Sequence, residues 1–200
     1  MNRVVEIRRI LQETSSLVES VTSISSDVAK AVELIVNAYR MRKKVVLFGN
    51  GGSASDAEHI AGELVGKFRF DRPSLPAIAL VSNPAALTAI ANDFSYDHVF
   101  ERAVDGSVDE GDIVFAISTS GESTNVVNGA LAARRKGATV IGFCGSKGRL
   151  ASLCDLALVV PSADTPRVQE VHIMLGHIIC ELVEEELFGG TSKRASRHLP

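Results

Sequence analysis

Four hydroxyl side chains gather around one glycine in the middle of the chain, where Ser118, Thr119, Ser120 and Ser123 surround Gly121. An apolar run typical of a buried strand precedes them, and an alanine-rich helical pattern follows. Hydroxyls and free backbone N–H groups at the start of a helix can bind an anion, because the positive end of the helix dipole faces the ligand. The lysine of a nucleotide-binding P-loop is absent. The segment therefore predicts a phosphate site, with an ordinary serine-capped turn as the alternative.

A histidine and a glutamate four residues apart, His59 and Glu63, fall on one face of a predicted helix. An imidazole and a carboxylate at this spacing can share a metal ion or a proton. The alternative is a surface pair, which stabilises a helix by only about 0.2–0.5 kcal/mol. Small and apolar residues flank the pair, and they favour a packed face without excluding the alternative.

The last predicted helix carries Gln169 and His177, eight residues apart. Their side chains are separated by about 80° around the helix and about 12 Å along it, so they could reach a common ligand only by stretching towards each other. His172 lies about 140° from His177, and a lone histidine on an apolar helix is ordinarily a core residue. Spacing alone does not connect this helix to His59 and Glu63.

A glycine turn follows the first predicted strand and contains Asn50, Gly51, Gly52 and Ser53. It resembles a dinucleotide-binding fingerprint, but its glycine spacing differs and no acidic residue ends the second predicted strand. The glycines still permit close approach of the backbone to a ligand. The Ser53 hydroxyl and the Asn50 amide add hydrogen-bond donors, so the turn predicts a ligand contact rather than a dinucleotide site.

The elements that position these residues alternate along the chain. Short apolar strands are predicted at residues 44–48, 77–81, 112–117, 139–143 and 156–160. Helices are predicted at residues 53–65, 84–91, 96–104, 124–135 and 166–188, with a helical turn at 146–152. The alternation predicts an α/β fold, a five-stranded parallel sheet with helices on both faces. Ligands bind such sheets at the carboxyl ends of strands, where the glycine turn and the serine segment lie.

Two amphipathic helices, at residues 4–21 and 27–39, precede the first strand. Their apolar faces need cover, either from the sheet or from the same pair in another subunit. We therefore expect residues 1–40 to serve oligomerisation and residues 41–188 to form the sheet domain. The polar, aperiodic residues 189–200 are expected to form a flexible tail.

Composition excludes several classes of protein. The 200 residues are 46% hydrophobic and 22% charged, as in an ordinary soluble enzyme, and the net charge of −3 argues against a nucleic-acid partner. The three cysteines have apolar neighbours, which predicts reduced thiols and a cytoplasmic location. Charges near the N-terminus argue against a signal peptide, and no apolar run reaches about eighteen residues, which argues against a membrane span.

Taken together, these segments resemble the phosphoheptose isomerase family, whose members carry a sugar-isomerase (SIS) domain of flavodoxin-like architecture. The resemblance covers residues 3–188 in order, through the motifs at 50–55, 59–63, 91–97, 117–123 and 167–177. It implies an aldose–ketose isomerase that converts D-sedoheptulose 7-phosphate into D-glycero-D-manno-heptose 7-phosphate through an enediol. That reaction is the first step towards ADP- or GDP-heptose, the precursors of glycans such as lipopolysaccharide.

The resemblance also implies the site. One Zn²⁺ per subunit would be bound by His59, Glu63, Gln169 and His177, with Glu63 and His177 as the catalytic acid–base groups. The substrate would contact Asn50, Gly51, Gly52, Ser53, Glu63, Asn92, Asp93, Ser118, Thr119, Ser120, Ser123 and Gln169. The family is a homotetramer with active sites between subunits. Lys67 departs from the family, because an arginine is expected there and lysine lacks its bidentate geometry.

Two other functions are compatible with the same fold. Non-catalytic SIS proteins that associate with the replication initiator DnaA share the tetramer but lack the full set of metal ligands, whereas this chain keeps all four positions. A different phosphosugar isomerase, or a sugar-phosphate sensor, would keep the phosphate site and change the sugar that is bound or converted.

Overall fold

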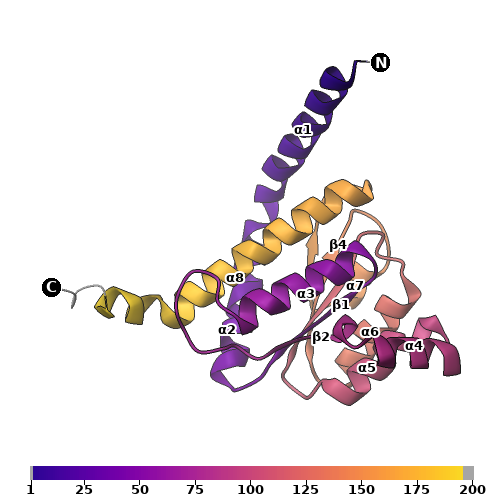
Figure 1. Cartoon of the computed structure of the whole chain (residues 1–200), viewed down its shortest axis with the longest axis vertical. Coiled ribbons are helices and arrows are strands. Elements are labelled where there is room, and N and C mark those ends of the chain that lie inside the picture. The colour runs from indigo at the N-terminus through magenta and orange to yellow at the C-terminus, as the bar shows by residue number, and fades with distance from the viewer. Residues whose placement is uncertain (1, 196–200) are drawn as a thin grey trace.

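A parallel sheet forms the centre of the computed structural model, which describes the backbone of residues 2–195 (Figure 1). Its five strands lie in the order β2-β1-β3-β4-β5, and every neighbouring pair is parallel. The strands are β1 (Val45–Gly49), β2 (Ala77–Ala79), β3 (Ile113–Ser118), β4 (Thr139–Cys144) and β5 (Leu156–Val159). The predicted α/β fold is therefore confirmed.

Helices cover both faces of the sheet, so the central strands β1 and β3 bury every residue. Alternate side chains point to opposite faces: Leu47 and Phe115 pack with one layer of helices, and Phe48 and Val114 with the other. The first layer contains α2 (Ser25–Arg40), α3 (Gly52–Val65) and α8 (Thr165–Ala195). The second contains α4 (Pro84–Asp93), α5 (Val99–Ser107), α6 (Thr124–Arg135) and α7 (Leu150–Leu153).

Several element boundaries differ from those predicted. β2 ends at Ala79 and a 3₁₀ turn, η2 (Leu80–Ser82), replaces its last residues, because this edge strand pairs only with β1. The helix predicted at 96–104 is divided into η3 (Tyr96–His98) and α5, and the turn predicted at 146–152 is the short α7.

The last helix is also longer than predicted, since the backbone of α8 stays helical to Ala195 rather than ending at residue 188. The polar, aperiodic sequence after residue 188 predicted an end, but the two glycines there each cost only about 1 kcal/mol in a helix that is already propagating. The predicted flexible tail is thus helical over most of its length, and residues 196–200 lie outside the described residues.

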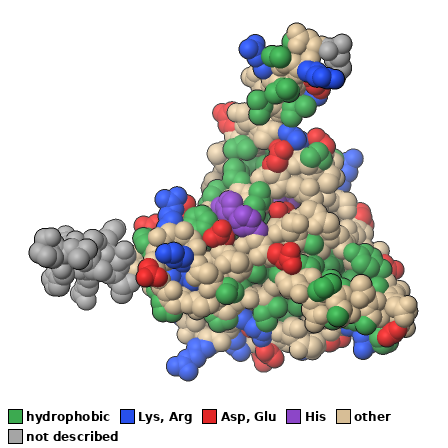
Figure 2. Space-filling model, in the orientation of Figure 1, with side chains coloured by type: hydrophobic (Ala, Val, Ile, Leu, Met, Phe, Trp, Pro, Cys, Tyr) green, Lys and Arg blue, Asp and Glu red, His purple; other side chains and the backbone are tan. Residues whose placement is uncertain are grey.

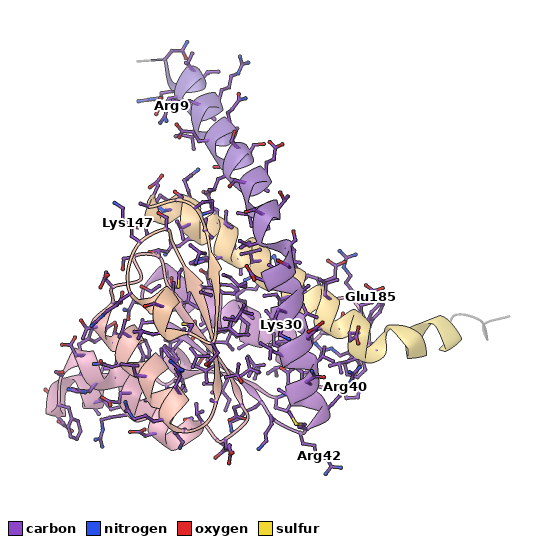
Figure 3. The ribbon with its side chains drawn as sticks, turned by 180° about the vertical axis from the view of Figure 1, so that it is seen from behind. Arg9, Lys30, Arg40, Arg42, Lys147 and Glu185 are labelled. Carbon is purple, nitrogen blue, oxygen red and sulfur yellow. The ribbon has the colours of Figure 1, made fainter. Side chains whose placement is uncertain are left out.

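The N-terminal helical pair is present as α1 (Arg3–Ser20) and α2, joined by the 3₁₀ turn η1 (Val21–Ile24). Helix α1 projects from the rest of the molecule, with Arg9 towards its tip (Figure 3), and buries none of its residues. Four large apolar side chains on it are more than half exposed: Val4, Val5, Ile7 and Leu11. A helix of this kind leaves its apolar face without cover in the single chain.

The three cysteines are free thiols, and Cys144 and Cys180 are buried, while Cys154 is half-buried. Burial raises the pKa of each thiol to about 12. Within residues 2–195 the structure contains no helix with the length and apolar character needed to cross a bilayer.

His172 on α8 is a core residue, as expected for a histidine on an apolar helix, and its exposed fraction is 0%. Its Nε2 lies 3.3 Å from the carbonyl oxygen of Cys144, and its Nδ1 has no hydrogen-bond partner among the described residues. The ring packs against Phe143, with 5.3 Å between centroids. Burial lowers the pKa of His172 to about 4 from an ordinary value of 6.5, against a smaller opposing effect of the Cys144 carbonyl.

This depressed pKa predicts a loss of stability in acid. Between pH 6.5 and about 4 the unfolded chain binds a proton at His172 that the folded chain does not, so the free energy of unfolding falls as pH drops. One pKa unit corresponds to about 1.36 kcal/mol, so the loss should reach about 3 kcal/mol. Urea unfolding across this range should show that loss in the wild type and a flatter profile in His172→Phe. Parallel profiles for the two proteins would contradict the prediction.

Candidate active site

A pocket of about 220 Å³ lies at the carboxyl ends of β1 and β3. The chain passes from β1 to β2 on one side and then to β3 on the other, so the strand order reverses there, and α/β sheets bind ligands at such a point. Both segments singled out in the sequence meet at this pocket. Its lining consists of Asn50, Gly51, Gly52, Ser53, Ile117, Ser118, Thr119, Ser123, Thr165 and Gln169.

Three helices begin at this pocket. Gly52 is the first residue of α3, Thr165 is the first residue of α8, and Ser123 is the N-cap of α6. The Ser123 side chain makes no capping hydrogen bond, and its Oγ instead accepts one from Ser118 Oγ at 3.2 Å. The serine segment is therefore not an ordinary serine-capped turn. Three positive dipole ends facing one cavity favour an anionic ligand.

The glycines of the turn have separate structural reasons. Gly51 has a φ of 56°, a left-handed conformation that glycine adopts without strain. Gly52 lies against the side chain of Gln169: a Cβ added at Gly52 would lie 2.5 Å from Gln169 Nε2. The missing side chain at position 52 is what admits Gln169 to the pocket.

Asn50 is held in place by two residues that the sequence reasoning missed. Its amide exchanges a pair of hydrogen bonds with the amide of buried Asn125, at 2.8 and 2.9 Å. Tyr96 Oη donates to Asn50 Oδ1 at 2.8 Å. Asn125 lies two residues after Ser123, and this position was an available signal. Tyr96 lies within the motif at 91–97, but its spacing gave it no role.

Four of the predicted substrate residues do not line the pocket: Glu63, which belongs to a second cluster, and Ser120, Asn92 and Asp93. Ser120 is exposed, with its Oγ 3.4 Å from Ser118 Oγ. Asn92 and Asp93 are exposed at the end of α4, where Asn92 Nδ2 donates to Asp93 Oδ1 at 2.8 Å. Among the described residues no hydrogen bond joins these two to the pocket, so the structure does not bring them into the site.

A second cluster lies further along α3 and α8, where three of the predicted metal ligands converge. His59, Glu63 and His177 each offer a ligand atom within 4.8 Å of the others. The two imidazole Nε2 atoms are 3.0 Å apart, and Glu63 Oε1 is 3.3 Å from His59 Nε2. Histidine side chains are visible on the surface of the face that carries α3 and α8 (Figure 2).

Close packing of the two helices brings these groups together. Gly176 precedes His177, and Ile60 follows His59; a Cβ added at Gly176 would lie 2.6 Å from Ile60 Cδ1. Glycine at this point therefore allows α8 to approach α3 beside the two histidines. The sequence spacing could not reveal this, because 118 positions separate His59 from His177.

The donor set of the cluster fits a divalent cation. Two imidazole nitrogens facing each other at 3.0 Å either share a proton or bind a common ion, and the adjacent carboxylate supplies an oxygen ligand. Gln169 is placed differently, since it lies against Gly52, and within the described part of the chain it makes no hydrogen bond to the other three. The structure thus joins three of the four predicted ligands directly.

Two further groups lie near this cluster. Asp56, one turn before His59 on α3, has a buried Oδ2 without a hydrogen-bond partner among the described residues. Burial raises the pKa of Asp56 to about 6, while His59 acts to lower it. Lys67 is exposed, and the described residues provide it with no ion-pair partner.

Comparisons with known proteins identify the relatives of this chain. A family model described as SIS domain matches residues 10–145. The chain is 48% identical over 185 residues to the phosphoheptose isomerase of Sulfurimonas denitrificans and 49% identical over 186 residues to that of Clostridium acetobutylicum; each alignment covers 92% of this chain and 91% of the relative. The solved structure of phosphoheptose isomerase GmhA from Neisseria gonorrhoeae matches with a TM-score of 0.87 at 33% identity, over 92% of this chain and all of that one.

The contact between Gly52 and Gln169 generates a prediction. Gly52→Ala should leave the fold intact, because alanine favours a helix, but the added methyl group should displace the Gln169 side chain. We expect the affinity for inorganic phosphate, measured by calorimetry, to fall about tenfold, which corresponds to ~1.4 kcal/mol. Gly62→Ala on the same helix is the control, because nothing lies within 4 Å of its added Cβ. Equal phosphate affinities for Gly52→Ala and Gly62→Ala would refute the steric argument.

Proposed function

The chain belongs to the phosphoheptose isomerase family of SIS-domain proteins, and on this premise we propose that it interconverts D-sedoheptulose 7-phosphate and D-glycero-D-manno-heptose 7-phosphate. The observation that carries the proposal is the pairing of two sites along the same helices. Helix α3 begins at the pocket with Gly52 and carries His59 seven residues later, about 10 Å further along the axis. A sugar phosphate can bridge that separation, whereas a bare phosphate cannot.

At one end of the substrate, the pocket would bind the phosphate. The hydroxyls of Ser118, Thr119 and Ser123 and the amides at the starts of α3 and α6 supply neutral donors to a dianion. Asn50, fixed by Asn125 and Tyr96, would orient the neighbouring sugar hydroxyls. We propose that Ser120, Asn92 and Asp93 also contact the substrate. These contacts require substrate binding or a second subunit to bring the three side chains closer to the pocket.

At the other end, proton transfer would proceed between the first two carbons. Isomerisation removes a proton from C1 of the ketose, gives an enediol and returns a proton to C2. We assign Glu63 as the base that takes and returns this proton, since a carboxylate can act on both adjacent carbons from one position. His177 is assigned to move protons between the two oxygens, because imidazole exchanges protons readily near neutral pH.

His59, Glu63 and His177 would hold a Zn²⁺ ion, with Gln169 as a fourth ligand. When bound, the ion would polarise the carbonyl group and stabilise negative charge on the enediolate oxygen. The support is the donor set described above, two imidazoles and a carboxylate within 4.8 Å, which suits zinc. A carboxylate has two oxygens, so Glu63 can serve the ion and the substrate proton in turn.

We further propose a homotetramer with active sites between subunits. The apolar side chains of α1 have no cover in the single chain, and a groove of about 400 Å³ lies beside η1 and α2. The groove is apolar, with Val18, Val21, Val28, Met174, Leu175, Ile178 and Leu182 among its lining residues. The His59 side chain is 49% exposed in one chain, so the site is open to a neighbouring subunit.

The convergence of three metal ligands does not favour the non-catalytic interaction module, which needs no such cluster. A sensor or an isomerase for another sugar phosphate would bind at the same pocket. Turnover of five-, six- and seven-carbon ketose phosphates separates these functions, since we expect conversion of the seven-carbon substrate alone.

Replacing the proposed base tests the mechanism. Glu63→Gln keeps the side-chain shape but cannot accept the C1 proton, so kcat should fall by about 10²–10⁴-fold. Conversion of sedoheptulose 7-phosphate can be followed by NMR. Glu58→Gln on the same helix is the matched control, because the Glu58 carboxylate bonds only to Ser82 among the described residues. Both variants should sediment as tetramers; undiminished turnover by Glu63→Gln would remove Glu63 from the mechanism.

Metal binding is tested without the reaction. Equilibrium dialysis should load one Zn²⁺ per chain, and competition with a chromogenic chelator should show His177→Ala to be weakened by at least about 100-fold. His98→Ala is the control, since exposed His98 pairs with Glu101 and lies outside the cluster. Equal zinc affinities in the two variants would show that the cluster is not the metal site.

A further inference from the structure

A buried carboxylate on α8, Glu184, organises the loop that follows α3. Glu184 is 1% exposed and accepts hydrogen bonds from three consecutive backbone N–H groups, those of Phe68, Arg69 and Phe70. Arg72 Nε donates to the same carboxylate at 2.9 Å. Burial raises the pKa of Glu184, but these donors together hold it below its ordinary value, so the group is charged.

Arg72 connects this carboxylate to the end of α3. Its side chain is 2% exposed, and its guanidinium donates to the carbonyl oxygens of Glu63 at 2.9 Å and Leu64 at 2.8 Å. The last carbonyls of a helix lack partners within the helix, so Arg72 satisfies them. The backbone of Glu63 is thereby tied to α8 through one side chain.

The same carboxylate also fixes the surroundings of His177. Phe68 N donates to Glu184 Oε1 at 2.9 Å, and the Phe68 ring lies against His177 with 5.8 Å between centroids. His177 and Glu184 are seven residues apart, two turns along one face of α8. One buried group therefore contacts the segments that set the position of both proposed acid–base residues.

We propose that Glu184 and Arg72 form a positioning pair that fixes Glu63 and His177 relative to each other. This inference rests on the function proposed above. Neither residue lines the pocket or belongs to the cluster of His59, Glu63 and His177. A buried ion pair is often no more stabilising than apolar residues of the same size, so stability alone gives little reason for it. The geometry of the pair gives a better reason for it. The planar guanidinium of Arg72 donates to a carboxylate and two carbonyls at once, which no apolar side chain can do.

Glu184→Gln tests the proposal, because the carboxamide keeps the side-chain volume but turns an NH₂ group towards the N–H donors that surround Glu184. With Zn²⁺ alone as the probe, we expect the affinity to fall at least tenfold at a temperature where the variant is folded. With sedoheptulose 7-phosphate we expect kcat to fall at least tenfold and KM to stay within twofold. Glu181→Gln is the matched control on the same helix, since the Glu181 side chain is 38% exposed and pairs with Arg69; it should leave all three values unchanged.

Arg72→Lys gives a second, independent measurement. Lysine keeps a positive charge beside Glu184 but cannot reach the carbonyls of Glu63 and Leu64 together, so it should reproduce the losses in kcat and zinc affinity. Values for both variants that equal those of Glu181→Gln would overturn the positioning role. Failure of both variants to fold would make the pair a stability element and would also overturn it. If the wild type does not turn over the sugar phosphate, the proposed function fails, and the zinc affinities still decide the positioning role.

Discussion

The packing of α3 against α8 on one face of the sheet is the constraint on which the candidate site depends. Helix α3 follows the first strand and α8 follows the last, so the groups they carry meet only when the sheet is complete. At the crossing point Gly176 admits Ile60, and the adjacent histidines then face each other at 3.0 Å. A close-packed interior transmits small displacements, so a shift of either helix would separate the three ligand groups.

The same two helices carry groups of opposite electrostatic character at their starts and along their middles. Their first residues line the pocket, where the helix dipoles would stabilise a negative charge although no lining residue is cationic. About two to three turns later, side chains on the same helices gather two imidazoles and a carboxylate, which suit a positive charge. Under the proposed function, one pair of helices would offer an anion site and a cation site at a separation fixed by the helix repeat.

Local patterns were sufficient to predict the strands, the helices and the strand-end location of the pocket, because these depend on periodicity and turn chemistry. The pairing of His59 with Glu63 also followed from local spacing. The meeting of His59 with His177 did not, and only the resemblance to a family supplied it. Tyr96 and Glu184 were missed for the same reason, since their partners lie 46 and up to 116 positions away. Asn125 was missed although it lies only two residues after Ser123. The predicted ends of elements were wrong at β2, an edge strand that pairs with only one neighbour, and at α8, which continues past glycine.

Helix α1 has a consequence for how the chain reaches its final state. An isolated helix of 18 residues is only marginally stable in water, and no residue of α1 is fully buried within its own chain. In the proposed homotetramer its order would come from the subunits that cover its apolar side chains, so folding of this segment and association would become a single equilibrium governed by mass action. Dilution would then unfold the first 20 residues before it disturbs the sheet. Protein concentration would therefore set the fraction of chains in which α1 is helical.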